Sequence, residues 1–157
     1  MTLNIGLQTK ELEGSIKVLN QLLADEFTLY TKTRKYHWNI VGPQFHDLHK
    51  FFEGLYEDLD ATIDEVAERT RALGGFAVAT LAEIVKLSNI KEEVAQNPSQ
   101  TEMISNLLQD HEQIIRELRM SIVKTQDEFN DAGTADFLTG LLEKHEKTAW
   151  MLRSLLV

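Results

Sequence analysis

Apolar residues recur at three- and four-residue steps along most of this 157-residue chain, which is the pattern of amphipathic helices. The first such stretch runs from Thr9 to Asn39 and ends before Gly42-Pro43, a pair that breaks helices. A second runs from Phe45 to Leu73 and stops at Gly74-Gly75, since glycine is common just beyond a helix end. The pattern predicts two long helices joined by a short turn.

The second half of the chain repeats this pattern after a longer connection, residues 76–98. We expect a short helix within this connection, because structureless loops of more than about 15 residues are uncommon. Helical periodicity returns from Thr101 to Phe129, and residues 130–133 have the composition of a turn. The last helix is expected from Thr134, a suitable N-cap, to Leu155.

Four long helices with one long crossover predict an all-α fold. A chain of 157 residues with 43% hydrophobic content has the size of one compact domain, residues 1–157. A long connection between the second and third helices, with short ones elsewhere, is the topology of a ferritin-like four-helix bundle. The sequence therefore predicts that bundle, with a short extra helix in the crossover.

Composition narrows the classes of function. The absence of cysteine excludes disulfides and thiolate metal sites and fits a reducing compartment. The first residues lack the pattern of a secretory signal, and no apolar run approaches the length of a membrane span, so we expect a soluble cytoplasmic protein with no membrane partner. A net charge of −9 disfavours binding to nucleic acid or anionic lipid.

Two pairs of possible metal ligands lie within the second predicted helix. His49/Glu53 and Asp64/Glu68 are each spaced i, i+4, so each pair shares one helix face. From Glu53 to Asp64 the helix rises about 16 Å, which is too far for the two residues to share one metal centre. The helix turns by about 100° per residue, so these eleven residues return the side chains to the same side of the helix. A second helix copy, antiparallel across a two-fold axis, would bring the two pairs together twice. The spacing predicts a dimer with paired metal sites at its interface.

The donor set indicates which metals would bind. Imidazole nitrogen with carboxylate oxygen suits iron or manganese and also accepts zinc. Diiron proteins with a centre inside one bundle use Glu-x-x-His motifs, and this chain contains none, which favours the interfacial site. Such pairs are also common on exposed helix faces, so a helical interaction protein without metal remains an alternative.

Several short motifs along the chain match one family. They are Lys35-Tyr36-His37-Trp38-Asn39, Leu48-His49, Asp64-Glu65-Val66-Ala67-Glu68-Arg69, Asp110-His111-Glu112, Asp136-Phe137-Leu138 and Trp150-Met151-Leu152. Together they resemble Dps, the ferritin-like DNA-binding protein from starved cells, over nearly the whole chain. The resemblance implies a dodecameric hollow shell that oxidises ferrous iron, preferably with hydrogen peroxide, and stores the ferric mineral inside.

The resemblance also implies roles for particular residues. It adds His37, which lies upstream of the two pairs. The implied ferroxidase ligands are therefore His37, His49, Glu53, Asp64 and Glu68. One departure is Glu53, where the family commonly has Asp, and the longer side chain would alter occupancy of the second iron position. Trp38 would donate an electron or intercept a radical; the alternative is an aromatic residue packed at the dimer interface.

Acidic residues surround the turn before the last helix, where the family builds three-fold pores that admit iron. They are Asp127, Asp131 and Asp136, and ordinary turn and helix-start chemistry is the alternative. The remaining histidines are left out of the site: His46 as a solvated residue, and His111 and His145 as structural residues within exposed charge patterns.

DNA binding in the family usually needs a lysine-rich mobile tail. The first nine residues contain no Lys or Arg, and the last residues directly follow the predicted helix. With the acidic net charge, we expect weak or absent DNA binding. The alternative function is a DNA-compacting nucleoid protein with a vestigial metal site.

Overall fold

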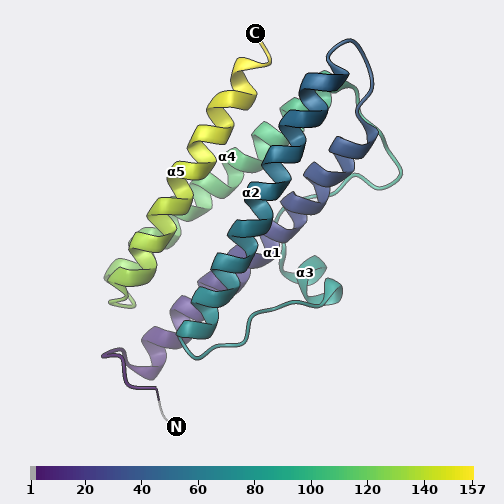
Figure 1. Ribbon diagram of the computed structural model, residues 1–157. Coiled ribbons are helices and arrows are strands. Elements are labelled where there is room, and N and C mark those ends of the chain that lie inside the picture. The colour runs from purple at the N-terminus through teal and green to yellow at the C-terminus, as the bar shows by residue number, and fades with distance from the viewer. Residues whose placement is uncertain (1–2) are drawn as a thin grey trace.

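The computed structural model describes residues 3–157, which fold as an antiparallel helical bundle (Figure 1). The elements are α1 (Thr9–Asn39), α2 (Phe45–Ala72), α3 (Leu81–Leu87), α4 (Gln100–Asp127) and α5 (Ala132–Ser154). No strand occurs among the described residues, and none of their helices is long and apolar enough to cross a membrane. The predicted all-α bundle, with a short helix in the crossover, is confirmed.

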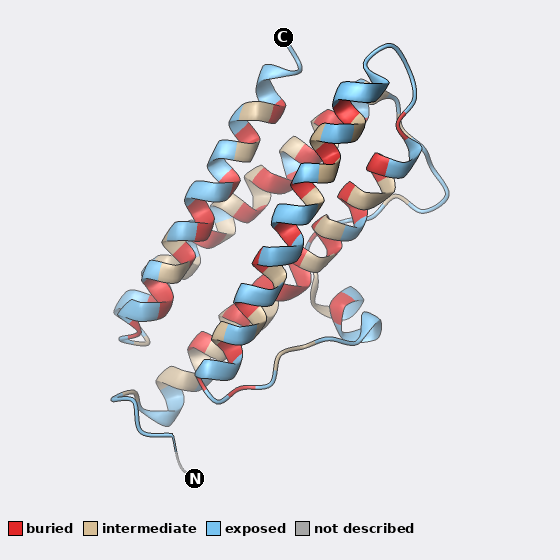
Figure 2. Cartoon of the chain, viewed as in Figure 1, coloured by how far each residue is buried: buried red, intermediate tan, exposed pale blue. Residues whose placement is uncertain are grey.

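The bundle consists of two helical hairpins, α1 with α2 and α4 with α5, joined by the crossover that contains α3 (Figure 1). Each long helix turns one stripe of buried residues toward the others (Figure 2). The largest fully buried side chains include Tyr36 and Leu29 of α1, Phe52 of α2, Ile114 and Leu118 of α4, and Leu138 of α5. The apolar periodicity of the sequence therefore corresponds to one continuous core.

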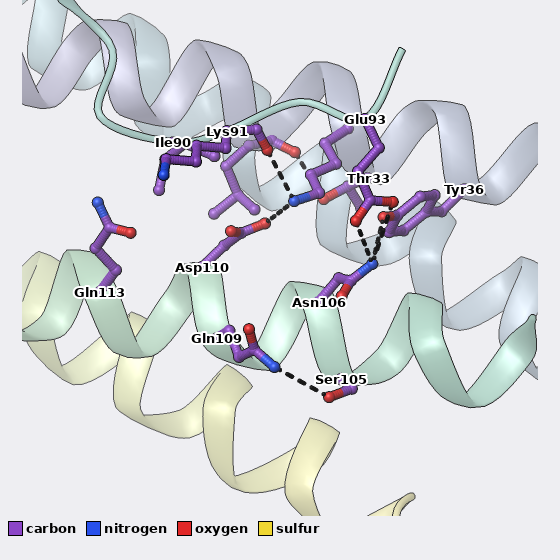
Figure 3. Close-up of polar contacts among 12 residues, drawn as sticks. Thr33, Tyr36, Ile90, Lys91, Glu93, Ser105, Asn106, Gln109, Asp110 and Gln113 are labelled. Atoms are coloured by element: carbon purple, nitrogen blue, oxygen red, sulfur yellow. Dashed lines mark hydrogen bonds and ion pairs between the residues drawn. The ribbon is translucent and has the colours of Figure 1, made fainter. Parts of the chain in front are cut away.

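The crossover is fixed to α1 and α4 by polar side chains. Lys32 of α1 lies 2.7 Å from a carboxylate oxygen of Asp110 on α4, and its Nζ also donates to the carbonyl of Lys91 in the crossover (3.1 Å; Figure 3). Nearby, the amide of Asn106 donates to the hydroxyl of Tyr36 at 3.1 Å and to a carboxylate oxygen of Glu93 in the crossover at 3.3 Å. Burial raises the pKa of Asp110, although the hydrogen bond from Lys32 opposes that shift. These contacts hold the long connection against the bundle.

The start of α5 differs from the expectation by a few residues. The N-cap is Asp131, and Thr134 is the residue that the cap engages: its backbone N–H donates to Oδ1 at 3.0 Å and its hydroxyl to Oδ2 at 2.6 Å. Arg69 of α2 adds an ion pair with Asp131 at 3.2 Å. An aspartate three residues upstream caps the helix with a carboxylate, so the prediction of Thr134 as N-cap was wrong.

Candidate metal centre

The centre of the site is a pair of histidines at the end of the first hairpin. His37 lies in the last turn of α1 and His49 in the first turns of α2, and their rings stack with centroids 3.8 Å apart. Nδ1 of His37 lies 2.8 Å from the carbonyl of His49, and Nδ1 of His49 lies 2.9 Å from the carbonyl of His37. The tight turn between the helices therefore brings together two residues that are twelve apart in the chain.

These reciprocal hydrogen bonds fix the tautomer of both imidazoles. A carbonyl oxygen only accepts, so each Nδ1 must donate, and in the neutral ring Nε2 then keeps its lone pair. Metal-bound histidines characteristically donate their other nitrogen to a carbonyl or carboxylate in this way. His37 and His49 are thus oriented with one nitrogen each available as a metal ligand.

Glu53 stands one helical turn beyond His49 and is partly exposed. Its Oε2 accepts a hydrogen bond from Lys50 at 2.6 Å. That hydrogen bond lowers the pKa of Glu53, burial opposes the shift, and the nearby His37 and His49 favour the charged form further. The side chain is therefore a carboxylate at neutral pH, and a metal ion would have to displace Lys50 to bind it in full.

Asp64 and Glu68 lie farther along α2 and are exposed. Because α2 is continuous from Phe45 to Ala72, about 16 Å of helix rise separates Asp64 from Glu53. Within residues 3–157 of a single chain, no three His, Asp or Glu side chains gather closely enough to hold a metal ion. The structure thus brings His37 and His49 into contact, places Glu53 one helical turn beyond His49, and leaves Asp64 and Glu68 farther along α2.

Aromatic and cationic side chains surround the histidine pair. The ring of Tyr56 meets that of His37 edge-on, with centroids 5.2 Å apart, and Phe45 stacks on His49 at 5.1 Å. The guanidinium of Arg34 lies over the rings of Tyr56 (4.9 Å) and Trp38 (5.5 Å). Trp38 itself is 66% exposed. Our site prediction omitted Tyr56, although its position three residues after Glu53 places it on the ligand stripe.

The three acidic residues of the suggested pore lie in different environments. Asp127 and Asp136 are exposed, whereas Asp131 is buried in the α5 cap. Burial alone would raise the pKa of Asp131, but the hydrogen bonds from Thr134, with help from Arg69, lower it. The helix-capping role is therefore sufficient to explain an aspartate at position 131.

The interpretation of His111 and His145 as parts of exposed charge patterns was wrong. Both residues are buried, 2% and 4% exposed, and they lie against each other inside the bundle. Their charged neighbours, including Asp110 and Glu112, point to other faces of α4, toward Lys32 and Arg153 respectively. When the neighbours of a buried polar residue in the sequence are charged, the sequence alone does not indicate that this residue faces the core.

Comparison with known proteins places the chain in a class. The ferritin-like domain family matches residues 16–157. The chain is 41% identical over 143 residues to the DNA protection during starvation protein 2 of Bacillus anthracis, covering 90% of this chain and 95% of that protein.

Solved structures agree with this assignment. DpsC from Streptomyces coelicolor superposes with a TM-score of 0.96 at 31% identity, covering all of this chain and 91% of that one. The Dps protein from Vibrio cholerae, described as a member of a broad superfamily of ferritin-like diiron-carboxylate proteins, gives 0.92 at 32% identity, covering 100% of this chain and 98% of that one. The chain is therefore a ferritin-like protein. Within that class it belongs to the Dps family.

Proposed function

We propose that this protein is a ferroxidase and iron-storage miniferritin. It oxidises ferrous iron with hydrogen peroxide, or with dioxygen, at sites shared between subunits. It stores the ferric product inside a shell and so limits oxidative damage. The observation that carries the proposal is the His37/His49 pair, whose reciprocal bonds to backbone carbonyls leave both Nε2 atoms free to bind metal. Family membership supports iron storage and DNA protection in general.

The proposed site needs two subunits. One subunit supplies the group of His37, His49 and Glu53, and a second copy of α2, running antiparallel, supplies Asp64 and Glu68. Two such sites form per dimer, because a two-fold axis repeats every contact. We place this dimer within a dodecamer, as in the family that the sequence resembles. Exposure of Asp64 and Glu68 in the isolated chain leaves them accessible to that second copy.

The residue types suit the reaction. Carboxylates hold hard ferrous ions, and neutral imidazole binds without adding charge. Two ferrous ions supply two electrons to one hydrogen peroxide, which takes up two protons and yields two water molecules and two ferric ions. Because both electrons are delivered at one site, no hydroxyl radical is released. The same ligands also accept zinc or manganese, which would compete with iron.

The surrounding residues have supporting roles in the proposal. Trp38 is positioned beside His37 to donate an electron or trap a stray radical, and Arg34 links it to Tyr56. Exposed Asp127 and Asp136, with Asp131 at the helix cap between them, contribute to an acidic route for entering iron. A net charge of −9 per subunit makes tight DNA binding unfavourable. A salt-sensitive gel shift at physiological ionic strength would instead favour a DNA-compacting function.

Anaerobic ferrous titration followed by peroxide tests the site. Native protein is compared with His49→Ala and Asp64→Ala, and Glu65→Ala is the matched control because that exposed carboxylate neighbours Asp64 but faces Lys144 of α5. We expect both ligand variants to lose fast oxidation and the control to keep it. Ligand variants that oxidise iron at the native rate contradict the proposal.

Mixing the two inactive variants tests the sharing of the site. In a mixed dimer, intact His49 of one subunit meets intact Asp64 of the other at one of the two sites. Random reassortment should therefore restore about a quarter of the native activity. No recovery after mixing has been proven, for example by mass spectrometry, would exclude the antiparallel arrangement.

A further inference from the structure

A second pair of histidines meets at the centre of the bundle, away from the α2 stripe. His111 of α4 and His145 of α5 have their Nδ1 atoms 2.8 Å apart and their ring centroids 5.0 Å apart. Both are more than nine-tenths buried. Two imidazole nitrogens this close share a single proton, because one must donate and the other accept.

Glu26 of α1 completes the cluster. It is fully buried, and its Oε1 lies 2.7 Å from Nε2 of His145. With Glu26 ionised, Nε2 of His145 donates the hydrogen, and Nδ1 of the same ring is turned toward His111. A carboxylate that holds the far nitrogen of a histidine is the arrangement that orients imidazole ligands in metal sites.

The cluster is incomplete as a hydrogen-bonded network. Among the described residues, neither Nε2 of His111 nor Oε2 of Glu26 has a partner, although both atoms are buried. Buried polar atoms are rarely left unpaired, and an exception points to a bound water, an ion or a functional role. Three ionisable residues from three helices are thus held together in the core with unused binding capacity.

A cavity of about 230 Å³ connects this cluster to the groove between α2 and α5. Both imidazoles line it, together with polar residues Asp58 and Thr62 of α2 and Thr148 of α5. A cavity of this size, lined in part by polar groups, has room for several water molecules. It therefore offers a route of entry and a source of further ligands.

We propose that His111 and His145 bind a borderline divalent metal ion, such as Zn²⁺ or Co²⁺, between their Nδ1 atoms. The ion takes the place of the shared proton, which moves to the unpartnered Nε2 of His111. Glu26 holds His145 in place, and water from the cavity completes the coordination. Imidazole nitrogen suits such ions. With metal–nitrogen bonds of 2.0–2.1 Å, two tetrahedral ligands stand about 3.3 Å apart, so the rings need to separate by only about half an ångström. This site lies within one subunit and does not depend on the interfacial ferroxidase.

The test uses protein in which the interfacial site is disabled by His49→Ala and Asp64→Ala. Equilibrium dialysis with Co²⁺ should leave about one ion per subunit, with visible absorption bands typical of nitrogen ligation. Adding His111→Gln should reduce this binding at least tenfold. Adding His46→Gln, which removes an exposed histidine on α2, is the matched control and should leave it unchanged.

Diffraction gives a readout that does not depend on a core substitution. Crystals of the disabled background soaked in Co²⁺ should show an anomalous peak between the two Nδ1 atoms. A cobalt-saturated crystal without that peak, or full cobalt binding by a correctly assembled His111→Gln variant, overturns the proposal. Iron oxidation is measured separately, so failure of the interfacial ferroxidase would leave this result interpretable.

Discussion

This protein has two pairs of histidines in contact, and the hydrogen-bond partners of their ring nitrogens differ. In the pair at the end of the first hairpin, His37 and His49 each donate to a backbone carbonyl, and their rings stack without bonding to each other. In the central pair, His111 and His145 bond directly through Nδ1, and only one of the outer nitrogens has a partner. In the proposed sites, the first pair would bind an ion without rearrangement, whereas the second would first have to move a proton off Nδ1.

This contrast shows how the partner of one ring nitrogen decides what the other can do. A carbonyl partner locks a neutral tautomer, so the ligand nitrogen is defined before any metal arrives. An imidazole partner can either donate or accept, so it does not decide which ring carries the shared proton. The position of that proton then depends on Glu26 and on burial. Four substitutions or conditions separate the two cases.

Removal of Glu26 should have the largest effect on stability. Glu26→Ala leaves the buried Nε2–H of His145 without its acceptor, and an unsatisfied buried polar group costs about 1–3 kcal/mol. We expect the free energy of unfolding from urea titration to fall by that amount. The comparable change at the exposed His46, His46→Ala, should cost less than about 0.5 kcal/mol. An equal decrease in the free energy of unfolding for the two variants would show that the hydrogen bond from His145 to Glu26 does not stabilise the fold.

Removal of His37 should act mainly on activity. His37→Ala deletes a ligand and the ring that stacks on His49, so initial peroxide-driven iron oxidation should fall by about 100-fold. Thermal unfolding measures the accompanying loss of stability, which should be smaller than for Glu26→Ala. A variant with unimpaired oxidation would remove His37 from the metal centre.

Mild acid should affect the central pair selectively. Burial, followed by the neighbouring His145, holds the pKa of His111 well below its usual value. The unfolded chain therefore binds more protons than the native protein as the pH falls below about 6.5, so stability is complete above that value and declines below it. The decline cannot exceed about 1.4 kcal/mol per pH unit for one proton.

Urea titrations at pH 7 and pH 5 measure this decline. The His111→Gln variant should show a shallower dependence than the parent, because it lacks the group that resists protonation. Carboxylates with shifted pKa values, such as Asp131, change stability mainly at lower pH. An identical pH dependence in parent and variant would contradict the assignment to His111.

The smallest expected effect concerns the carboxylate beside the first pair. Glu53→Asp shortens the side chain by one methylene and removes it from Lys50, with which it is paired at 2.6 Å. We expect a change in oxidation rate of less than about threefold, since the pair is exposed and weak, together with a changed iron stoichiometry in anaerobic titration. A native-like stoichiometry would mean that Glu53 and Asp serve the second iron position equally well.

The sequence predicted the fold well because helix periodicity is a local property. The first helix has the predicted bounds, and the other long helices end within two residues of them. The placement of the two pairs on α2 was predictable for the same reason, since i, i+4 spacing fixes the face on which each pair lies; their role as metal ligands stays a prediction. His37, by contrast, came from the family resemblance, because its contact with His49 depends on how the turn at Gly42 closes.

The central cluster was not predictable in the same way. Glu26, His111 and His145 lie on three helices, so no short motif relates them. Flanking charges such as Asp110 and Glu112 made the surroundings look exposed. Which face of a helix is buried depends on all its neighbours at once, and the apolar pattern does not record a single polar residue turned inward.

The crossed bonds between His37 and His49 also set an order of events. They form when the α1–α2 hairpin closes, so each subunit would carry the two histidines of the proposed centre as soon as it folds. The carboxylate half arrives, in the proposed dimer, only when two subunits meet. A lone subunit would then be unable to turn over ferrous iron in solution, and oxidation would begin only where a shell exists to receive the product. Assembly of the subunits would thus be required before iron oxidation could begin.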